Sequence, residues 1–274
     1  MSAMRLSFTT LSCPDWDWDT ILQQAARFGF HGIELRGVRD EMYLPRLPQF
    51  LPENIDNTMA QLRDKNLAIS CLDTSCKFDD DEKFHNSIQE GKDTIDLAQR
   101  LKVPYIRVFG DSIPELSHME KTIDQIARGL NLLGEYARDK DVYVLIETHG
   151  DFADSNRLLK ILQKVHAGNP VGVLWDINHP YMFFKEEMSE TYAKLAPYIK
   201  HVHVKDTKIV NGEFKLSLVG QGDLPIAEAV DLLKKNGYNG WLSLEWEKRW
   251  HPEIEDPEIA LPAFVEYITP LLQD

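Results

Sequence analysis

The feature that most constrains the fold of this chain is a regular alternation of short apolar runs with longer amphipathic stretches. Eight short runs, rich in β-branched and aromatic residues, begin 27 to 41 residues apart along the 274-residue sequence. They cover Arg5–Leu11, Gly32–Arg36, Leu67–Leu72, Tyr105–Phe109, Val142–Glu147, Val171–Trp175, Lys200–Val204 and Trp241–Trp246. This spacing fits one strand followed by one helix, because neighbouring parallel strands need a crossover of a dozen or more residues.

The stretches between these runs carry helical periodicity. In Trp18–Phe28 the apolar residues recur at helical spacing, and Gly29 closes the segment. Similar stripes occupy Ile88–Leu101, Ile123–Tyr136, Leu158–Val165, Ile226–Leu233 and Ile259–Leu271. Eight strand–helix units in a chain of this length predict an α/β fold, a (β/α)8 TIM barrel, with residues 1–274 as a single domain. The alternative, an open doubly wound sheet, lacks support because no Gly-x-Gly-x-x-Gly follows the first run.

Composition excludes several functional classes. The chain carries 30 Lys and Arg against 44 Asp and Glu, a net charge of −14, with no dense basic patch, so we expect no nucleic-acid partner. It has no 18-residue apolar run and no signal-peptide core at its start, so we expect a soluble, cytoplasmic protein without a membrane partner. Its three cysteines, Cys13, Cys71 and Cys76, are sparse and odd in number, which favours reduced thiols.

Polar residues gather where the last four predicted strands end. Glu147 ends the fifth run, Asp176 follows the sixth, His203 lies in the seventh and Glu245 lies in the eighth. The carboxyl ends of all strands of a (β/α)8 barrel meet at one mouth, so we expect these side chains to converge. Three buried carboxylates need a neutralising charge. Carboxylate oxygens with one imidazole suit Mn²⁺, Mg²⁺, Co²⁺ or Fe²⁺, so the pattern predicts a divalent metal site.

These motifs resemble the xylose-isomerase-like TIM-barrel superfamily, also called AP endonuclease family 2, and within it the sugar phosphate isomerases and epimerases. The resemblance spans essentially the whole chain and rests on four pieces: Glu147, Asp176-x-x-His179, Val202-His203-Val204-Lys205-Asp206 and Glu245. It implies that four residues ligate one divalent ion: Glu147, Asp176, His203 and Glu245. For that ion we expect Mn²⁺, with Mg²⁺, Co²⁺, Fe²⁺ or Zn²⁺ as alternatives. The resemblance also implies that His179 contacts substrate beside the metal and that the chain forms a homo-oligomer.

The activity implied by the resemblance is that of a metal-dependent isomerase or epimerase acting on a sugar or sugar derivative. Glu147 and Glu245 act as the acid and base: one removes the proton next to a carbonyl group, the metal stabilises the enediolate, and reprotonation completes the reaction. Their strands lie three apart on an eight-strand ring, so a sugar fits between them. Two alternatives stay open: a metal-dependent lyase or dehydratase acting on a keto sugar or keto-inositol, and an apurinic endonuclease.

The sequence also departs from the patterns of these relatives. Ketose 3-epimerases of the family place a further Glu and a further Arg where this chain has Ala153 and Ile209. The sugar contacts therefore differ, and epimerisation of tagatose, psicose or fructose is not supported. Apurinic endonucleases need extra histidines after the third and fourth strands, where this chain has Asp73-Thr74-Ser75 and Gly110-Asp111.

Five further residues near the predicted mouth are candidates for substrate contact: Glu34, Arg107, His149, Lys205 and Trp246. For Glu34 and Arg107 the alternative is a structural salt bridge. For His149 it is a loop histidine satisfied by its neighbours. Lys205 either binds substrate or supports the metal ligands. Trp246 is expected to form part of an aromatic wall for sugar stacking.

Two other features concern local structure. By strand period His201 shares a face with His203. The segment Gly220-Gln221-Gly222-Asp223-Leu224-Pro225 looks like a phosphate cradle, but it lacks the Lys and the strand context of a P-loop. We therefore interpret it as a tight turn, with Asp223 near the start of the next helix.

Overall fold

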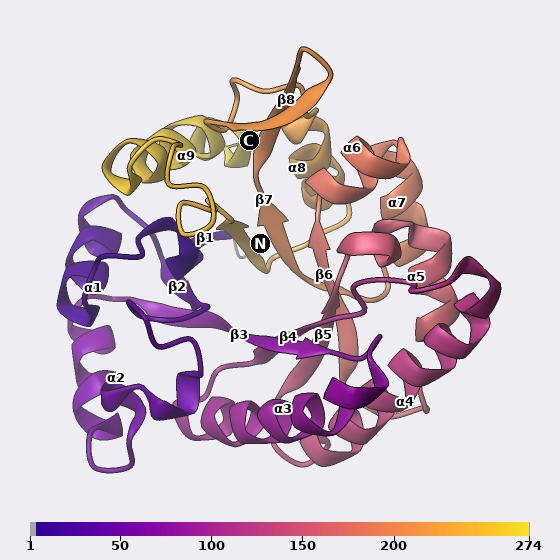
Figure 1. Cartoon of the computed structure of the whole chain (residues 1–274). Helices are drawn as coiled ribbons and strands as arrows, with labels where there is room; N and C mark the ends of the chain where they lie inside the picture. The colour runs from indigo at the N-terminus through magenta and orange to yellow at the C-terminus, as the bar shows by residue number, and fades with distance from the viewer. Residues whose placement is uncertain (1–3, 274) are drawn as a thin grey trace.

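Eight parallel strands form one curved sheet, with the order β1-β10-β7-β6-β5-β4-β3-β2. The structure, a computed structural model, describes residues 4–273. The strands are β1 Arg5–Phe8, β2 Gly32–Leu35, β3 Ala68–Lys77, β4 Tyr105–Phe109, β5 Tyr143–Glu147, β6 Val171–Asp176, β7 Ile199–Val204 and β10 Trp241–Leu244. A parallel bridge between Thr9 and Glu34 brings the edge strands β1 and β2 together. The sheet is thus a nearly closed barrel, and the predicted TIM-barrel fold is confirmed (Figure 1).

Helices surround the barrel on its outside (Figure 1). They are α1 Trp18–Arg27, α2 Ile55–Asp64, α3 Asp81–Leu101, α4 Met119–Ala137, α5 Ser155–Leu162, α6 Asn178–Phe184, α7 Met188–Leu195, α8 Ile226–Lys235 and α9 Pro257–Leu272. Side chains define some of their starts: Asp17 accepts a hydrogen bond from the backbone N–H of Thr20 at the start of α1. None of the helices in residues 4–273 is long and apolar enough to cross a membrane.

Three helices and one hairpin of the structure are not predicted by the sequence patterns described above. Helices α2, α6 and α7 are short and occupy segments where no clear apolar stripe was recognised. The connection after β7 contains a hairpin of β8, Asp206–Val210, and β9, Glu213–Ser217, which stands out from the barrel beside β7 (Figure 1). The Asn211-Gly212 turn of this hairpin has positive φ at both residues, 54° and 84°. Asn-Gly between alternating residues is a strong hairpin signal, so the sequence did contain the information.

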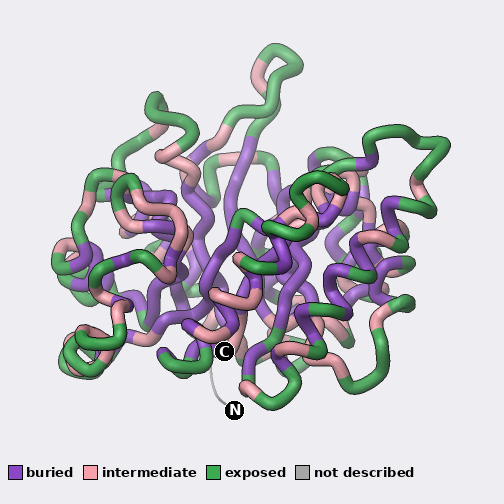
Figure 2. The backbone as a smooth tube through the Cα atoms, turned by 60° about the horizontal axis from the view of Figure 1, so that its bottom comes forward, coloured by how far each residue is buried: buried purple, intermediate pink, exposed green. Residues whose placement is uncertain are grey.

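Burial separates the barrel from its surroundings. The barrel strands are largely buried, while exposed residues concentrate in the loops and on the outer faces of the helices (Figure 2). The three cysteines, Cys13, Cys71 and Cys76, are buried and free, as expected. Polar residues are also buried inside the ring, and they concentrate toward the carboxyl ends of the strands, where they require partners.

The glycine-rich segment after β9 is organised by a carboxylate of the chain itself. Asp206 accepts hydrogen bonds from the backbone N–H groups of Gly220 and Gly222, at 2.9 Å each, and of Leu224, at 3.3 Å. Asp223 does not cap α8; its carboxylate accepts from the N–H of Ile209 in the hairpin. The segment is therefore a turn, as interpreted from the sequence, and its donors are directed to Asp206 rather than to an external anion.

Candidate metal centre and active site

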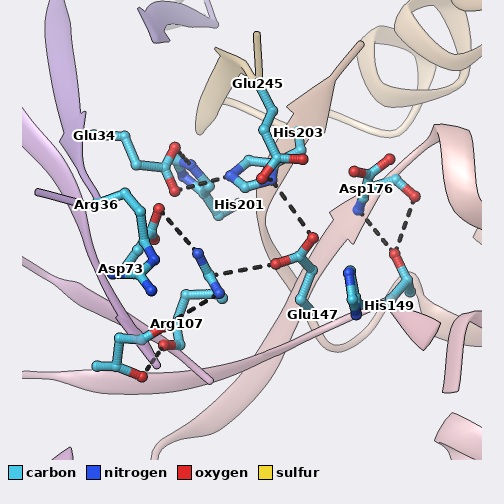
Figure 3. Close-up of polar contacts among 12 residues, drawn as sticks. Glu34, Arg36, Asp73, Arg107, Glu147, His149, Asp176, His201, His203 and Glu245 are labelled. Atoms are coloured by element: carbon cyan, nitrogen blue, oxygen red, sulfur yellow. Dashed lines mark hydrogen bonds and ion pairs between the residues drawn. The ribbon is translucent and has the colours of Figure 1, made fainter. Parts of the chain in front are cut away.

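Four residues from four consecutive barrel positions form a buried cluster at the mouth. Glu147 ends β5, Asp176 ends β6, His203 lies in β7 and Glu245 directly follows β10. One ligand atom from each lies within 4.8 Å of the others, and all four residues are buried (Figure 3). The Nδ1 atom of His203 is 3.4 Å from Glu245 Oε1 and 3.8 Å from Glu147 Oε1. The convergence expected from the strand ends is thus present.

Glu34 sets the orientation of the His203 ring. Its carboxylate accepts hydrogen bonds from Nε2 of two histidines, His203 at 2.9 Å and His201 at 2.8 Å. All three side chains are fully buried. Burial opposes ionisation, yet the two histidines hold the pKa of Glu34 well below its usual value. A carboxylate only accepts, so His203 donates to Glu34 from Nε2, and its Nδ1 is turned toward the cluster.

This arrangement bears on the two roles considered for Glu34. Both of its oxygens are engaged by imidazoles below the cluster, and it is fully buried. These contacts favour the structural role for Glu34, and its contact with substrate stays an untested prediction. His201 and His203 do share a face, as their alternation predicted.

Changing Glu34 to Gln is expected to weaken metal binding by about 10- to 100-fold, the usual effect of losing an outer-shell partner. A glutamine side chain has one acceptor oxygen and one NH2 donor in place of the two carboxylate oxygens. It therefore cannot accept a hydrogen bond from each imidazole, and the imidazole facing the NH2 group would have to rotate or change its tautomer. Mn²⁺ titration by calorimetry measures the effect. The matched control is His201→Gln, which removes the other imidazole from Glu34; an equal loss in both variants would contradict the orienting role.

Two cations lie among the acids. Arg107 in β4 is buried, with Nε 3.3 Å from Glu147 Oε2 and Nη2 3.4 Å from Asp73 Oδ2. Lys205 places Nζ 2.7 Å from Glu245, 2.7 Å from Glu247 and 3.0 Å from Asp176. Arg107 therefore neutralises Glu147 and Asp73 inside the barrel, the structural alternative considered from the sequence. Lys205 neutralises a different set of acids, Asp176, Glu245 and Glu247.

The electrostatics of the four residues are strongly perturbed. Burial, and then repulsion from Glu245, raises the pKa of Glu147 to about 7. Burial also raises the pKa of Asp176. For Glu245 burial acts the same way, but Lys205 and His203 outweigh it and hold its pKa well below the usual value. The pKa of His203 is raised well above its usual value, because Glu34 and Glu245 outweigh the effect of burial.

The donor set fits a divalent cation. Within residues 4–273, three buried atoms of the cluster make no hydrogen bond of good geometry: Glu147 Oε2, Asp176 Oδ2 and His203 Nδ1. Each is within ion-pair distance of a charged group, at 3.3 Å from Arg107, 3.0 Å from Lys205 and 3.4 Å from Glu245. A buried group of three carboxylates and one imidazole is what a hard or borderline cation binds. Two further groups could hold a metal by distance alone, and both contain Glu34: one with His201 and His203, the other with Cys71 and Asp73. In both groups the Glu34 carboxylate is already hydrogen-bonded to the two imidazoles.

Two histidines form the wall beside the cluster. Burial, and then the charge of Lys205, lowers the pKa of His179 well below its usual value, and its Nδ1 lies 2.9 Å from the carbonyl oxygen of Thr148. The neighbouring His149 contacts His179 edge to face at 5.0 Å and pairs through Nδ1 with Asp111 at 2.9 Å. His179 is thus a neutral, oriented imidazole at the mouth, and His149 is partly exposed beside it.

A cavity of about 500 Å³ opens next to the cluster. His179 and Lys205 connect it to the metal centre, and Glu247 and Phe214 line it farther out. Neither of these last two residues was selected from the sequence: Glu247 follows the eighth strand, and Phe214 lies on the unanticipated hairpin. A second cavity, of about 580 Å³, lies between the loops after β3 and β4 and contains none of the four cluster residues.

Trp246 does not form an aromatic wall at the mouth. Its side chain is fully buried in the core, and its indole N–H donates to the carbonyl oxygen of Glu255 at 2.8 Å. Successive residues of an extended segment point to opposite sides, so Glu245 and Glu247 both reach Lys205 while Trp246 points away. The expectation of substrate contact by Trp246 is therefore wrong.

Comparison with known proteins gives both a family and individual relatives. A family model described as a xylose isomerase-like TIM barrel matches residues 22–264. Inosose dehydratase of Clostridium botulinum (strain Eklund 17B / Type B) is 29% identical over 159 residues, and that of Clostridium tetani is 30% identical over 160 residues. Each match covers 52% of this chain and 51% of the relative, so the chain spans about half the length of the curated relatives it matches.

Solved structures resemble the whole chain. The probable 3-DHS dehydratase AsbF from Bacillus anthracis has a TM-score of 0.78 at 20% identity, covering 97% of this chain and 99% of that one. The IOLI protein with a binding zinc atom has a TM-score of 0.80 at 19% identity, and a D-tagatose 3-epimerase-like protein has 0.75 at 21%. In both cases 98% of each chain is covered. At these identities the likeness establishes the fold.

Proposed function

Because the chain belongs to the xylose isomerase-like TIM-barrel family, we propose that it is a divalent-metal-dependent enzyme that moves a proton at the carbon next to a carbonyl group of a sugar or sugar derivative. The observation that carries this proposal is the buried cluster of Glu147, Asp176, His203 and Glu245, with ligand atoms within 4.8 Å of one another. Isomerisation or epimerisation is the first candidate outcome, because two glutamates are available to handle the proton.

The proposed metal ligands are the same four residues. Bound there, a divalent ion would supply Lewis acidity to the oxygens of the substrate. We propose Mn²⁺, because three carboxylates and one imidazole suit it, and the zinc atom bound by the IOLI protein makes Zn²⁺ the first alternative. The Nδ1 atom of His203, turned toward Glu245 and Glu147 by the hydrogen bond from Nε2 to Glu34, supports the imidazole as a ligand.

The chain's own residues supply the acid–base chemistry. Glu147 and Glu245 lie on β5 and after β10, with β6 and β7 between them, so they approach a bound sugar from different sides. One glutamate accepts the proton from the carbon, and the other returns a proton to the opposite face, which inverts a stereocentre, or to the neighbouring carbon, which isomerises. Lys205 holds the carboxylate of Glu245 in place, and His179 lines the cavity in which the sugar would lie.

Dehydration is the second candidate outcome. The curated relatives are inosose dehydratases, and removal of the same proton precedes loss of a hydroxyl group at the next carbon. Such a reaction needs a group that donates a hydrogen bond to the leaving hydroxyl. Lys205 is the candidate donor, because its ammonium group lines the cavity and stays protonated: Asp176 and Glu245 raise its pKa well above the usual value despite burial. Its three carboxylate contacts use its three N–H groups, so the leaving hydroxyl group would replace one of them.

Deuterium exchange tests the shared step directly. The metal-loaded protein in D₂O is mixed with ketoses, aldoses, keto-inositols and 3-keto-glycosides, and proton NMR follows the hydrogens next to the carbonyl group. We expect incorporation of deuterium with Mn²⁺ and none after chelation. A rearranged sugar assigns the isomerase or epimerase, and an unsaturated product that has lost water assigns the dehydratase. Exchange that persists without metal, or no exchange with any of these compounds, would refute the proposal.

A further inference from the structure

An aromatic path leads outward from the metal centre to the hairpin. His179 contacts Phe183 of α6 at 5.7 Å between ring centroids, and Phe183 contacts Phe214 of β9 edge to face at 5.0 Å. The two phenylalanines are 54% and 45% exposed, although they pack against each other. Large apolar side chains left exposed together around a cavity are typical of a binding surface.

The cavity beside the cluster has two different walls. Beside the cluster its lining is polar, with Asn178, Lys205 and Glu247. The hairpin adds the apolar side chains of Phe214 and Leu216, with Lys215 between them in the sequence. Phe183 and Ile254 also belong to the outer part. A small polyhydroxylated ring beside His179 would fill the inner part and leave the apolar wall uncovered. The outer part therefore calls for a second, apolar portion of the same ligand.

The charges around the cavity disfavour a phosphate at this outer part. Lys205 is already paired with three carboxylates, and Lys215 pairs with Glu213 at 3.8 Å. His251 lies between Glu247 at 3.6 Å and a second glutamate, Glu253, at 3.4 Å. The glycine-rich turn nearby directs its N–H donors to Asp206. Among the described residues that line this cavity, Lys205, Lys215 and His251 each face an acid, which suits a neutral group. Just outside the lining, Lys185 donates to the carbonyl oxygen of Met182 and lies with Nζ 5.8 Å from the ring centroid of Phe214.

From these observations we propose that Phe183 and Phe214 form a specificity subsite for the apolar or aromatic substituent of an uncharged, glycoside-like substrate. This inference rests on the proposed function, because it places the sugar ring at the metal centre. It names the substrate class: a carbonyl-bearing sugar ring that carries an apolar group rather than a phosphate. An aromatic substituent would complete the edge-to-face contacts of the two phenylalanines, which prefer such geometry.

The test compares ligands that differ only in the substituent. Methyl and phenyl 3-keto-glucosides, with methyl 3-keto-glucoside 6-phosphate as the charged ligand, are titrated by calorimetry into the Mn²⁺-loaded full chain. We expect a phenyl glycoside to bind about tenfold more tightly than its methyl partner. The preference should fall to less than about threefold in Phe214→Ala and, on the other wall, in Phe183→Ala. Circular dichroism confirms that both variants are folded.

Ile209→Ala is the matched control, because Ile209 lies on the same hairpin and is 50% exposed but does not line the cavity. It should leave the phenyl preference unchanged. Equal binding of phenyl and methyl glycosides, a preference that survives in Phe214→Ala, tighter binding of the phosphate, or no binding of any glycoside would each overturn the subsite. Metal-dependent exchange without a phenyl preference refutes this inference alone, whereas a phenyl preference without exchange refutes the proposed function alone.

Discussion

Glu147→Gln will reduce deuterium exchange and turnover by about 1,000-fold or more, within the range that a positioned acid or base contributes, while the barrel stays folded. The amide keeps the shape of the side chain but can neither accept nor return the proton, and it weakens a metal ligand. Stability should change little, because the loss of the Glu147 charge relieves repulsion with Glu245, while Arg107, which loses one ion-pair partner, keeps Asp73. Glu245→Gln should lose activity to the same extent. NMR exchange rates and thermal unfolding measure the two effects.

The control for both variants is Glu213→Gln, which changes an exposed glutamate on the hairpin that lies outside the cluster and the cavity. It should retain full activity. If Glu147→Gln or Glu245→Gln kept more than about a tenth of the wild-type exchange rate, the acid–base pair would be assigned to the wrong residues. If either variant fails to fold, Glu147→Asp and Glu245→Asp replace them in the test. Aspartate keeps the charge but has a shorter side chain, so both variants should still lose most of the activity.

His203→Ala will weaken Mn²⁺ binding by at least about 100-fold, more than the loss of an outer-shell partner. It removes the nitrogen donor and leaves three carboxylates with no imidazole between them. Lys205→Ala lies two residues along the same strand region and serves as the comparison. Its Nζ contacts the same acids that a metal would bind, so its removal takes away a competing cation, and we expect Mn²⁺ affinity to be kept or increased.

Calorimetric titration of metal-free protein, with metal content after dialysis as a second measurement, distinguishes the two variants. Equal loss of metal in His203→Ala and Lys205→Ala would show that the histidine is not a ligand. The activity of Lys205→Ala adds a separate readout. If dehydration is the reaction, this variant should bind metal yet lose product formation, because the hydrogen-bond donor to the leaving hydroxyl group is missing.

The fold was predictable because burial imposes regular periods on the sequence. Strands inside a ring of helices read as short apolar runs, and helices read as amphipathic stripes, so the eight strands were located within a few residues. Helix α2 was missed because its ten residues include only two buried ones, Thr58 and Leu62. The hairpin was missed because β8 continues the strand-like pattern of β7 almost without a break.

The candidate site was predictable for residues whose position follows from the strand that carries them. Glu147, Asp176, His203 and Glu245 each end or follow a strand, and parallel strands bring their carboxyl ends together whatever the details of packing. The role of Glu34 could not be settled in the same way, because its partners lie 167 and 169 residues away along the chain. The prediction for Trp246 was wrong because neighbouring residues of an extended segment point in alternate directions. Its neighbours Glu245 and Glu247 point toward Lys205 at the mouth, so Trp246 points into the core.

The hydrogen bonds of Glu34 to His201 and His203, across the barrel, also have a consequence for the order in which the chain folds. All four proposed ligands lie between residues 147 and 245, whereas the groups that orient and neutralise them, Glu34 and Arg107, come from the first half of the chain. A nascent chain that has completed only its early strands has no ligands, and a detached later half would have ligands without orientation. We therefore expect the proposed metal affinity to develop only when contacts of long sequence separation form, so that metal binding would report the last stages of folding.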